Sequence, residues 1–188
     1  MVLMSLNKEH QQQLLTVAKA SIQHGLQEGG SLKINIDDYP KLLAECRATF
    51  VTLKLDHQLR GCIGRLEATR PLIEDVAENS FLAAFQDPRF SPLLIDEFIE
   101  LDIHISLLTE PILMSFRSEQ DLMSQLQPNV DGLILVEGSR KGTFLPSVWE
   151  QLTEPKQFLS HLKQKAGLSS NHWSDTLKVY RYQAETIA

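Results

Sequence analysis

Two spacings of hydrophobic residues alternate along the chain, and each predicts a different kind of element. Over residues 7–28, apolar residues recur at intervals of three and four between the candidate N-cap Asn7 and the pair Gly29-Gly30, which predicts an amphipathic helix. The apolar residues of this pattern are Leu14, Leu15, Ala18, Ile22 and Leu26. Three further helices are predicted, after Pro71, after the capping pattern Ser118-x-x-Asp121, and over 158–166.

Alternation of apolar and polar residues predicts strands in most of the remaining apolar segments. The predicted strands are 47–55, 59–64, 101–107, 132–137, 142–145 and 177–182. Because short turns join several of them, antiparallel pairing is favoured over a doubly wound parallel sheet. We therefore expect an α+β protein with mainly antiparallel or mixed sheets flanked by helices.

The segment 48–64 is predicted to form a hairpin around a turn at residues 56–58. On the apolar face this turn sets the pairs Leu55–Leu59, Leu53–Gly61 and Val51–Ile63. On the opposite face it sets the pairs Lys54–Arg60 and Thr52–Cys62. Two cations would then flank one thiol and favour its thiolate form. Like charges directly opposite each other are unfavourable, which predicts an anionic side chain or ligand above this face.

Composition removes several classes of protein. With 188 residues and ordinary hydrophobic and charged fractions, the chain is expected to be a single domain, 1-188. Two cysteines exclude a disulfide framework and a Cys-rich zinc site, and a net charge of −6 disfavours nucleic-acid binding. Since neither a signal peptide nor a membrane span is recognisable from Met1 onward, a cytoplasmic protein is expected.

The segment Leu59-Arg60-Gly61-Cys62-Ile63-Gly64 carries the candidate site. Cys62 is the candidate catalytic residue because a guanidinium lies nearby. The candidate ligand-binding residues are Arg60, Gly61, Gly64 and Arg89. Structural alternatives stay open, since a cysteine on a strand is more often a small buried hydrophobe, and glycines near a hairpin often mark only a bulge. Arg89 would equally well pair with Asp87 in its own loop.

Other chemistry-bearing residues have simpler structural explanations. His104, on the polar face of a predicted strand, could act as a base, but a structural histidine is the more common case. Trp149 and Trp173, near Lys156, Lys163 and Lys165, could stack on a nucleic-acid base, although core packing explains them better. No two histidines are spaced i,i+4 and no standard catalytic motif is present, so no metal site is predicted.

These motifs, in this order, resemble the AMMECR-type domain family, also called AmmeMemoRadiSam system protein A. The family is named for a human chromosomal region deleted in Alport syndrome with intellectual disability, midface hypoplasia and elliptocytosis. The matching segments are Leu59-Arg60-Gly61-Cys62-Ile63-Gly64, Asp87-Pro88-Arg89-Phe90-Ser91-Pro92, Ile105-Ser106-Leu107-Leu108, Gly142-Thr143-Phe144-Leu145-Pro146 with Val148, and Lys165-Ala166-Gly167-Leu168. Residues 1–45 match only as a helical lead-in.

The resemblance implies two unequal lobes with a cleft between them. The larger lobe would contain both chain ends, and the smaller would come from the middle of the chain, roughly 65-130. It also implies two partners, a Memo-like protein and a radical S-adenosylmethionine enzyme. It implies no established reaction, so cofactors stay unknown.

Three functions follow as hypotheses. The first is an accessory or adaptor protein that binds an anionic small molecule or an acidic partner segment in its cleft. The second is an enzyme that uses Cys62 in a basic, glycine-rich cleft. The third is a nucleotide- or RNA-binding module, suggested by the pattern Gly61-x-x-Gly64, although the net charge disfavours it.

Overall fold

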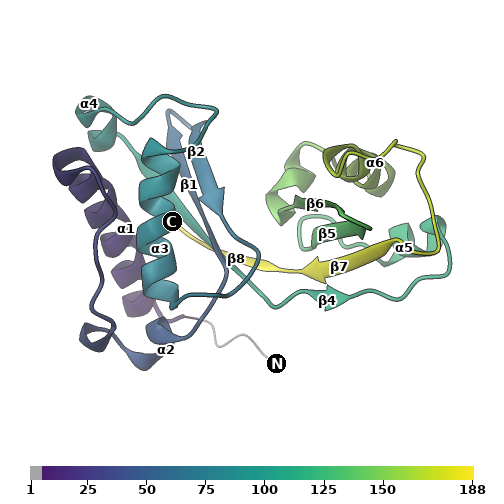
Figure 1. The fold of residues 1–188 in the computed structure, drawn as a ribbon, viewed down its shortest axis with the longest axis horizontal. Coiled ribbons are helices and arrows are strands. Elements are labelled where there is room, and N and C mark those ends of the chain that lie inside the picture. Colours follow the sequence, from purple (N-terminus) through teal and green to yellow (C-terminus); the bar gives the residue numbers. More distant parts are fainter. Residues whose placement is uncertain (1–5) are drawn as a thin grey trace. The chain divides into compact units, whose positions relative to one another are not determined.

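The computed structural model describes residues 6–188 and divides into two compact units, each with its own four-stranded sheet (Figure 1). One unit comprises the described residues up to Leu108 together with Glu185–Ala188, and the other comprises Thr109–Ala184. The second unit therefore begins at Thr109 and not near residue 65, because the helix and strand that precede Thr109 complete the core of the first unit. Residues 1–5, part of the stretch searched for a signal peptide, lie outside the described residues.

The first unit is a sheet with two long helices packed on one face. Its elements are α1 (Lys8–Glu28), α2 (Lys41–Ala44), β1 (Thr49–Leu55), β2 (Gln58–Gly64), α3 (Leu72–Phe85), α4 (Ile95–Ile99), β3 (Asp102–Leu108) and β8 (Ala184–Ile187), with a 3₁₀ turn, η1, at Ile36–Asp38. The strand order is β2-β1-β3-β8, and β1 pairs antiparallel with both β2 and β3. The sequence predicted α1, β1, β2, α3 and β3, but not the shorter elements.

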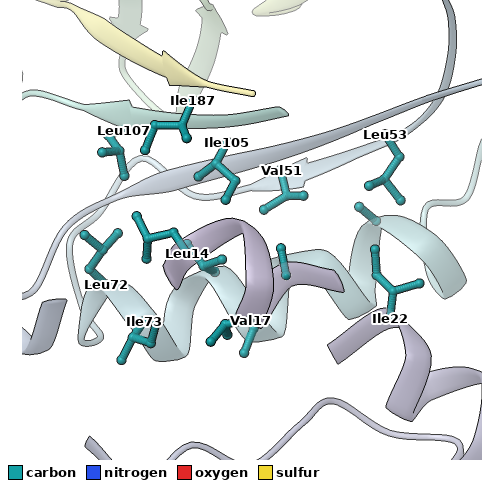
Figure 2. Close-up of a cluster of buried hydrophobic side chains, with 14 of the residues drawn as sticks. Leu14, Val17, Ile22, Val51, Leu53, Leu72, Ile73, Ile105, Leu107 and Ile187 are labelled. Carbon is teal, nitrogen blue, oxygen red and sulfur yellow. The ribbon is translucent and has the colours of Figure 1, made fainter. Parts of the chain in front are cut away.

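The predicted caps and alternation build the core of this unit. Asn7 accepts a hydrogen bond from the His10 N–H at 2.8 Å, and Gly29 ends α1 with a φ of 79°. Alternate residues of β1 point inward, so that Val51 and Leu53 are fully buried. They meet apolar side chains of α1, α3 and β3, including Leu14, Ile22, Leu72 and Ile105 (Figure 2).

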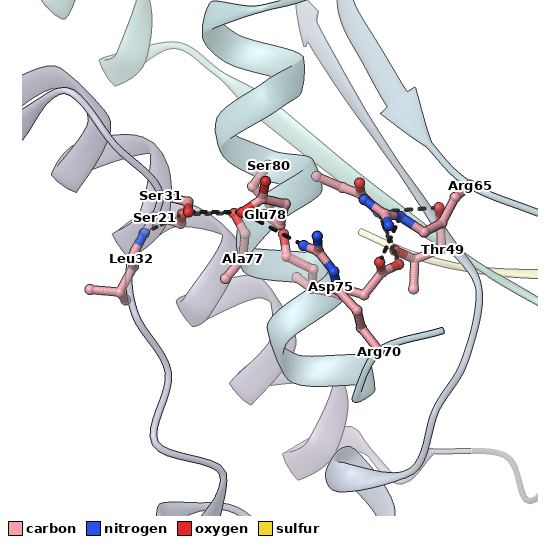
Figure 3. A network of polar contacts seen from close by, with 12 residues as sticks. Ser21, Ser31, Leu32, Thr49, Arg65, Arg70, Asp75, Ala77, Glu78 and Ser80 are labelled. Atoms are coloured by element: carbon pink, nitrogen blue, oxygen red, sulfur yellow. Dashed lines mark hydrogen bonds and ion pairs between the residues drawn. The ribbon is translucent and has the colours of Figure 1, made fainter. Parts of the chain in front are cut away.

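A buried polar network joins α3 to the start of β1 (Figure 3). Asp75 accepts hydrogen bonds from the Thr49 hydroxyl at 2.7 Å and from the Asn79 amide at 2.9 Å, and it forms an ion pair with Arg65 at 3.2 Å. Burial raises the pKa of Asp75, an effect that the Thr49 hydrogen bond and Arg65 oppose. The network ties α3 to the start of β1 through the Thr49 and Asn79 hydrogen bonds to Asp75.

The second unit is also a sheet with helices against it. Its elements are β4 (Ile112–Leu113), α5 (Glu119–Gln125), β5 (Gly132–Glu137), β6 (Arg140–Phe144), the 3₁₀ turn η2 (Pro146–Glu150), α6 (Pro155–Lys165) and β7 (Lys178–Tyr182). The strand order is β4-β7-β5-β6, with antiparallel pairs throughout. The predicted capping pattern is confirmed, because Ser118 Oγ accepts the Asp121 N–H at 3.1 Å.

A lysine is fully buried in the core of the second unit. The Lys163 ammonium donates to Glu119 at 2.6 Å and lies 5.7 Å from the centre of the Trp173 ring. Trp149 stacks on Phe158 at 3.8 Å. Both tryptophans thus belong to this core, and their fluorescence reports on the second unit.

The expected α+β class, with two antiparallel sheets flanked by helices, is confirmed. The expected cleft between lobes stays a prediction. Across residues 6–188, we find no helix that is both long enough and apolar enough to span a bilayer.

Candidate functional site

The hairpin that carries the candidate site differs from the predicted one in its turn. Asp56 and His57 alone form the turn, both with positive φ, and Leu55 pairs with Gln58 instead of Leu59. A bulge then leaves Arg60 without a register partner, so the predicted pair Lys54–Arg60 is wrong. Beyond the bulge, the predicted pairs Leu53–Gly61, Thr52–Cys62 and Val51–Ile63 are confirmed.

The backbone of Cys62 is held from outside the sheet. Since β2 is the edge strand in the order β2-β1-β3-β8, one side of it has no strand partner. On that side the Cys62 N–H donates to Asp87 at 2.8 Å, and the Cys62 carbonyl accepts from Arg89 at 3.2 Å. We call Asp87 and Arg89 the edge clamp, because together they take the place of a neighbouring strand at Cys62.

The two residues of the edge clamp also bind each other. Asp87 accepts from Arg89 Nε at 2.9 Å and from Nη2 at 2.7 Å, which is a two-pronged, charge-assisted pair. These hydrogen bonds hold the pKa of Asp87 well below its usual range, although burial opposes them. Only 2% of the Asp87 side chain is exposed, against 53% of Arg89. The pairing of Arg89 with Asp87, left open as an alternative by the sequence, is therefore observed.

A second ion pair ties the bulge in β2 to α4. Arg60 donates through Nε and Nη2 to the two carboxylate oxygens of Glu97, both at 2.8 Å. Glu97 also accepts the N–H of Leu94 at the start of α4. These hydrogen bonds lower the pKa of Glu97 and raise that of Arg60. Arg60 is thus paired with a carboxylate of this chain.

Gly61 and Gly64 lie where two backbones approach closely. A Cβ on Gly61 would collide with the carbonyl oxygen of Ala83 in α3, and one on Gly64 would collide with Thr49 and Phe50 of β1. Both glycines are accordingly needed for packing. Whether Gly61, Gly64, Arg60 and Arg89 also bind a ligand stays a prediction.

The thiol itself lies on the polar side of the sheet, away from α1 and α3. Cys62 Sγ is half-buried and lies 3.1 Å from the Thr52 hydroxyl, within hydrogen-bond range. Thr52 is also the register partner of His104 in β3, so the three residues form a row across one face. Burial lowers the pKa of His104, and the charge of Lys54 lowers it further.

The structure gives the aromatic candidates a structural role. Trp149 is 1% exposed and donates to the Asp131 carbonyl at 2.7 Å, so it has no free face for a nucleic-acid base. Trp173 lies against Phe116 at 5.5 Å in the same core. Within residues 6–188 no group of three or more His, Cys, Asp or Glu side chains is arranged to hold a metal ion.

Sequence reasoning missed an exposed aliphatic surface beside the candidate site. Leu94, Ile95 and Ile99, at and within α4, are 66%, 60% and 75% exposed, and Glu97 of the same helix binds Arg60 of the candidate site. We call Leu94, Ile95 and Ile99 the α4 patch. Large aliphatic side chains grouped on a surface mark interaction sites more often than isolated ones do. The sequence does not predict this surface, because α4 has only five residues, too few to show a helical period.

The protein is a two-unit α+β protein. On the edge strand of its first sheet, the backbone N–H and carbonyl of Cys62 are bound by Asp87 and Arg89. The AMMECR1 family model matches residues 15–187, and the chain belongs to this family. The segment that carries the resemblance, 59–64, is the strand β2 described above.

Relatives of this chain occur in archaea and bacteria. A protein of Methanothermobacter thermautotrophicus is 35% identical over 182 residues, which cover 96% of this chain and 94% of the relative. A protein of Thermotoga maritima is 37% identical over 152 residues, covering 79% and 82%. Among solved structures, an uncharacterized protein from Pyrococcus horikoshii has a TM-score of 0.85 at 32% identity, covering 92% of this chain and 88% of that one.

Proposed function

We propose that the chain is a cytoplasmic accessory or adaptor protein of a modification pathway, and that it docks on a Memo-like protein or a radical S-adenosylmethionine enzyme through the α4 patch. The observation that carries this proposal is the exposure of Leu94, Ile95 and Ile99 next to the braced strand β2. Aliphatic side chains that are more than half exposed in a cluster gain free energy when a partner covers them.

Charge beside the patch fits an acidic segment of the partner. Arg89 is bound to Asp87, yet 53% of its side chain faces solvent. A carboxylate of the partner can therefore approach its outer edge. Such a rim contact adds selectivity and a faster association rate more than affinity.

An adaptor explains the candidate site better than an enzyme does. Arg60 and Arg89 are each paired with a carboxylate of this chain, and the Cys62 thiol has the Thr52 hydroxyl as its hydrogen-bond partner. An activated nucleophile needs a base within hydrogen-bond reach or an unpaired cation nearby. The ion pairs at Arg60 and Arg89 instead fix β2 and α4 in place, which suits a docking surface.

The test measures binding of the purified full-length chain to the Memo-like and radical S-adenosylmethionine proteins of the same organism by titration calorimetry. The variant Ile95→Asp/Ile99→Asp is expected to weaken binding at least tenfold, because two charges would be desolvated at the interface. Ile112→Asp, in the second unit at 71% exposure, is the matched control and should leave binding unchanged. Equal binding by the α4 variant and the wild type would refute docking at this patch, as would no binding to either protein.

An enzyme that uses Cys62 is the second candidate, and the row of Cys62, Thr52 and His104 favours it. The test compares the alkylation rate of Cys62 in the folded protein with that of Cys46, which is exposed and serves as an internal reference. The variants Cys62→Ser and Cys46→Ser assign the two rates. Labelling of Cys62 faster than Cys46 at neutral pH supports the enzyme. Labelling of Cys62 only on unfolding supports the adaptor.

A further inference from the structure

A pocket of about 690 Å³ opens in the first unit, on the side where β3 begins. Its walls come from one face of α1, the end of β1, the hairpin turn and the first residues of β3. Leu15, Leu101 and Ile103 form a half-buried apolar floor. This size falls within the range of pockets that hold small-molecule ligands.

The strand β8 lies beside the later residues of β3. Ser106 of β3 lies beside Thr186 of β8, with their hydroxyl oxygens 3.5 Å apart. The pocket is lined by the earlier residues of β3, from Asp102 to His104, and by Ala188, which follows β8.

Two lysines and one carboxylate side chain line the pocket, in a protein whose net charge is −6. Lys19 comes from α1 and Lys54 from β1, and Asp102 of β3 is the one acidic side chain of the lining. Among residues 6–188, neither Lys19 nor Lys54 has a carboxylate within ion-pair distance. The cations of this pocket, unlike Arg60 and Arg89, are not neutralised by ion pairs within the chain.

From this combination we infer that the pocket binds a small molecule with an apolar body and a carboxylate or phosphate group. The floor of Leu15, Leu101 and Ile103 takes the apolar body, and Lys19 and Lys54 bind the anionic group. The pocket is lined by none of the three residues of the α4 patch, so this inference does not depend on the proposed adaptor function.

The probe for the test is 8-anilinonaphthalene-1-sulfonate, whose sulfonate represents the anionic group and whose fluorescence rises in apolar surroundings. Saturable binding to the folded, full-length chain is expected. Lys19→Gln and Lys54→Gln should each weaken binding roughly fivefold, because each removes one charge contact at a partly exposed site. Lys33→Gln, at an exposed lysine outside the pocket, should not weaken it.

Two further measurements make the result decisive. N-phenyl-1-naphthylamine has the same rings without the sulfonate, and its binding should not change in Lys19→Gln or Lys54→Gln. Backbone amide shifts on probe addition should be largest at residues 101–104. Equal weakening by Lys33→Gln, no effect of either pocket lysine, or shifts confined to the α4 patch would each overturn the inference. Binding of Lys54→Gln to the partner protein is measured in parallel and should be unchanged. This measurement distinguishes a failure of the pocket inference from a failure of the adaptor function.

Discussion

Removal of the Asp87 carboxylate tests whether the edge clamp holds Cys62 in place. In Asp87→Ala the Cys62 N–H loses its acceptor on the open edge of β2, and Arg89 loses its ion pair. A half-buried N–H left without a partner costs about 1–3 kcal/mol. The Arg89 contribution is small, about 0–1 kcal/mol, because more than half of that side chain is exposed. We therefore expect a loss of about 2 kcal/mol in the free energy of unfolding.

The assay is urea unfolding followed by far-UV circular dichroism, together with amide hydrogen exchange. Because both tryptophans lie in the second unit, tryptophan fluorescence serves as an internal reference for that unit. Exchange of the Cys62 amide should accelerate in Asp87→Ala. Asp96→Ala, at an exposed carboxylate nearby, should change stability by less than about 0.5 kcal/mol. An unchanged exchange rate at Cys62 in Asp87→Ala would refute the clamp.

The same pair predicts a dependence on pH. Arg89 holds the pKa of Asp87 below its unfolded value of about 3.9, so the ionised carboxylate stabilises the fold at every pH above that value. The contribution is lost as the pH falls through the folded pKa. The stability difference between the wild type and Asp87→Asn should therefore be constant from about pH 5 to 8 and should narrow below about pH 4. A difference that grows on acidification would contradict this assignment.

Two pairs of substitutions test the packing. Gly61→Ala should cost about 1–3 kcal/mol by urea unfolding, because its Cβ would collide with the Ala83 carbonyl, whereas Gly30→Ala, with open space around it, should be neutral or slightly stabilising. Lys163→Met should cost less stability than Lys163→Ala, because Met fills the buried space and Glu119, 38% exposed, can be solvated, whereas Ala leaves a cavity that should cost about 3 kcal/mol. Tryptophan fluorescence follows the unfolding of the two Lys163 variants, because both tryptophans lie in the second unit. Equal losses of stability in Lys163→Met and Lys163→Ala would contradict the prediction.

Local patterns predicted the regular elements because their signals lie within each element. Asn7 and Gly29 cap α1 as expected, and the alternation in 101–107 became β3. The turn of the hairpin was predicted wrongly, because Asp56 and His57 both adopt positive φ without a glycine. Because of this turn and the bulge that follows it, Lys54 pairs with Leu59 instead of Arg60.

The contacts of the candidate site could be predicted only in part. The pairing of Arg89 with Asp87 is local in sequence, and it was among the alternatives. The ion pair of Arg60 with Glu97 joins residues 37 positions apart through a helix too short to show periodicity. The Cys62 backbone bonds depend on β2 being an edge strand, which follows from the strand order of the whole sheet.

These contacts change where an external anion would be bound. The sequence suggested that Lys54 and Arg60, facing each other across the hairpin, would require an anionic group. That pair does not form, and Glu97 binds Arg60 while Asp87 binds Arg89. An anionic ligand at either arginine would have to compete with a two-pronged pair inside the protein. Lys19 and Lys54 present no such competition, so the pocket at the start of β3 is the better place to look for an anionic small molecule. Arg60 and Arg89 then hold β2 and α4 in place, and the exposed surface of α4 is available to a partner protein.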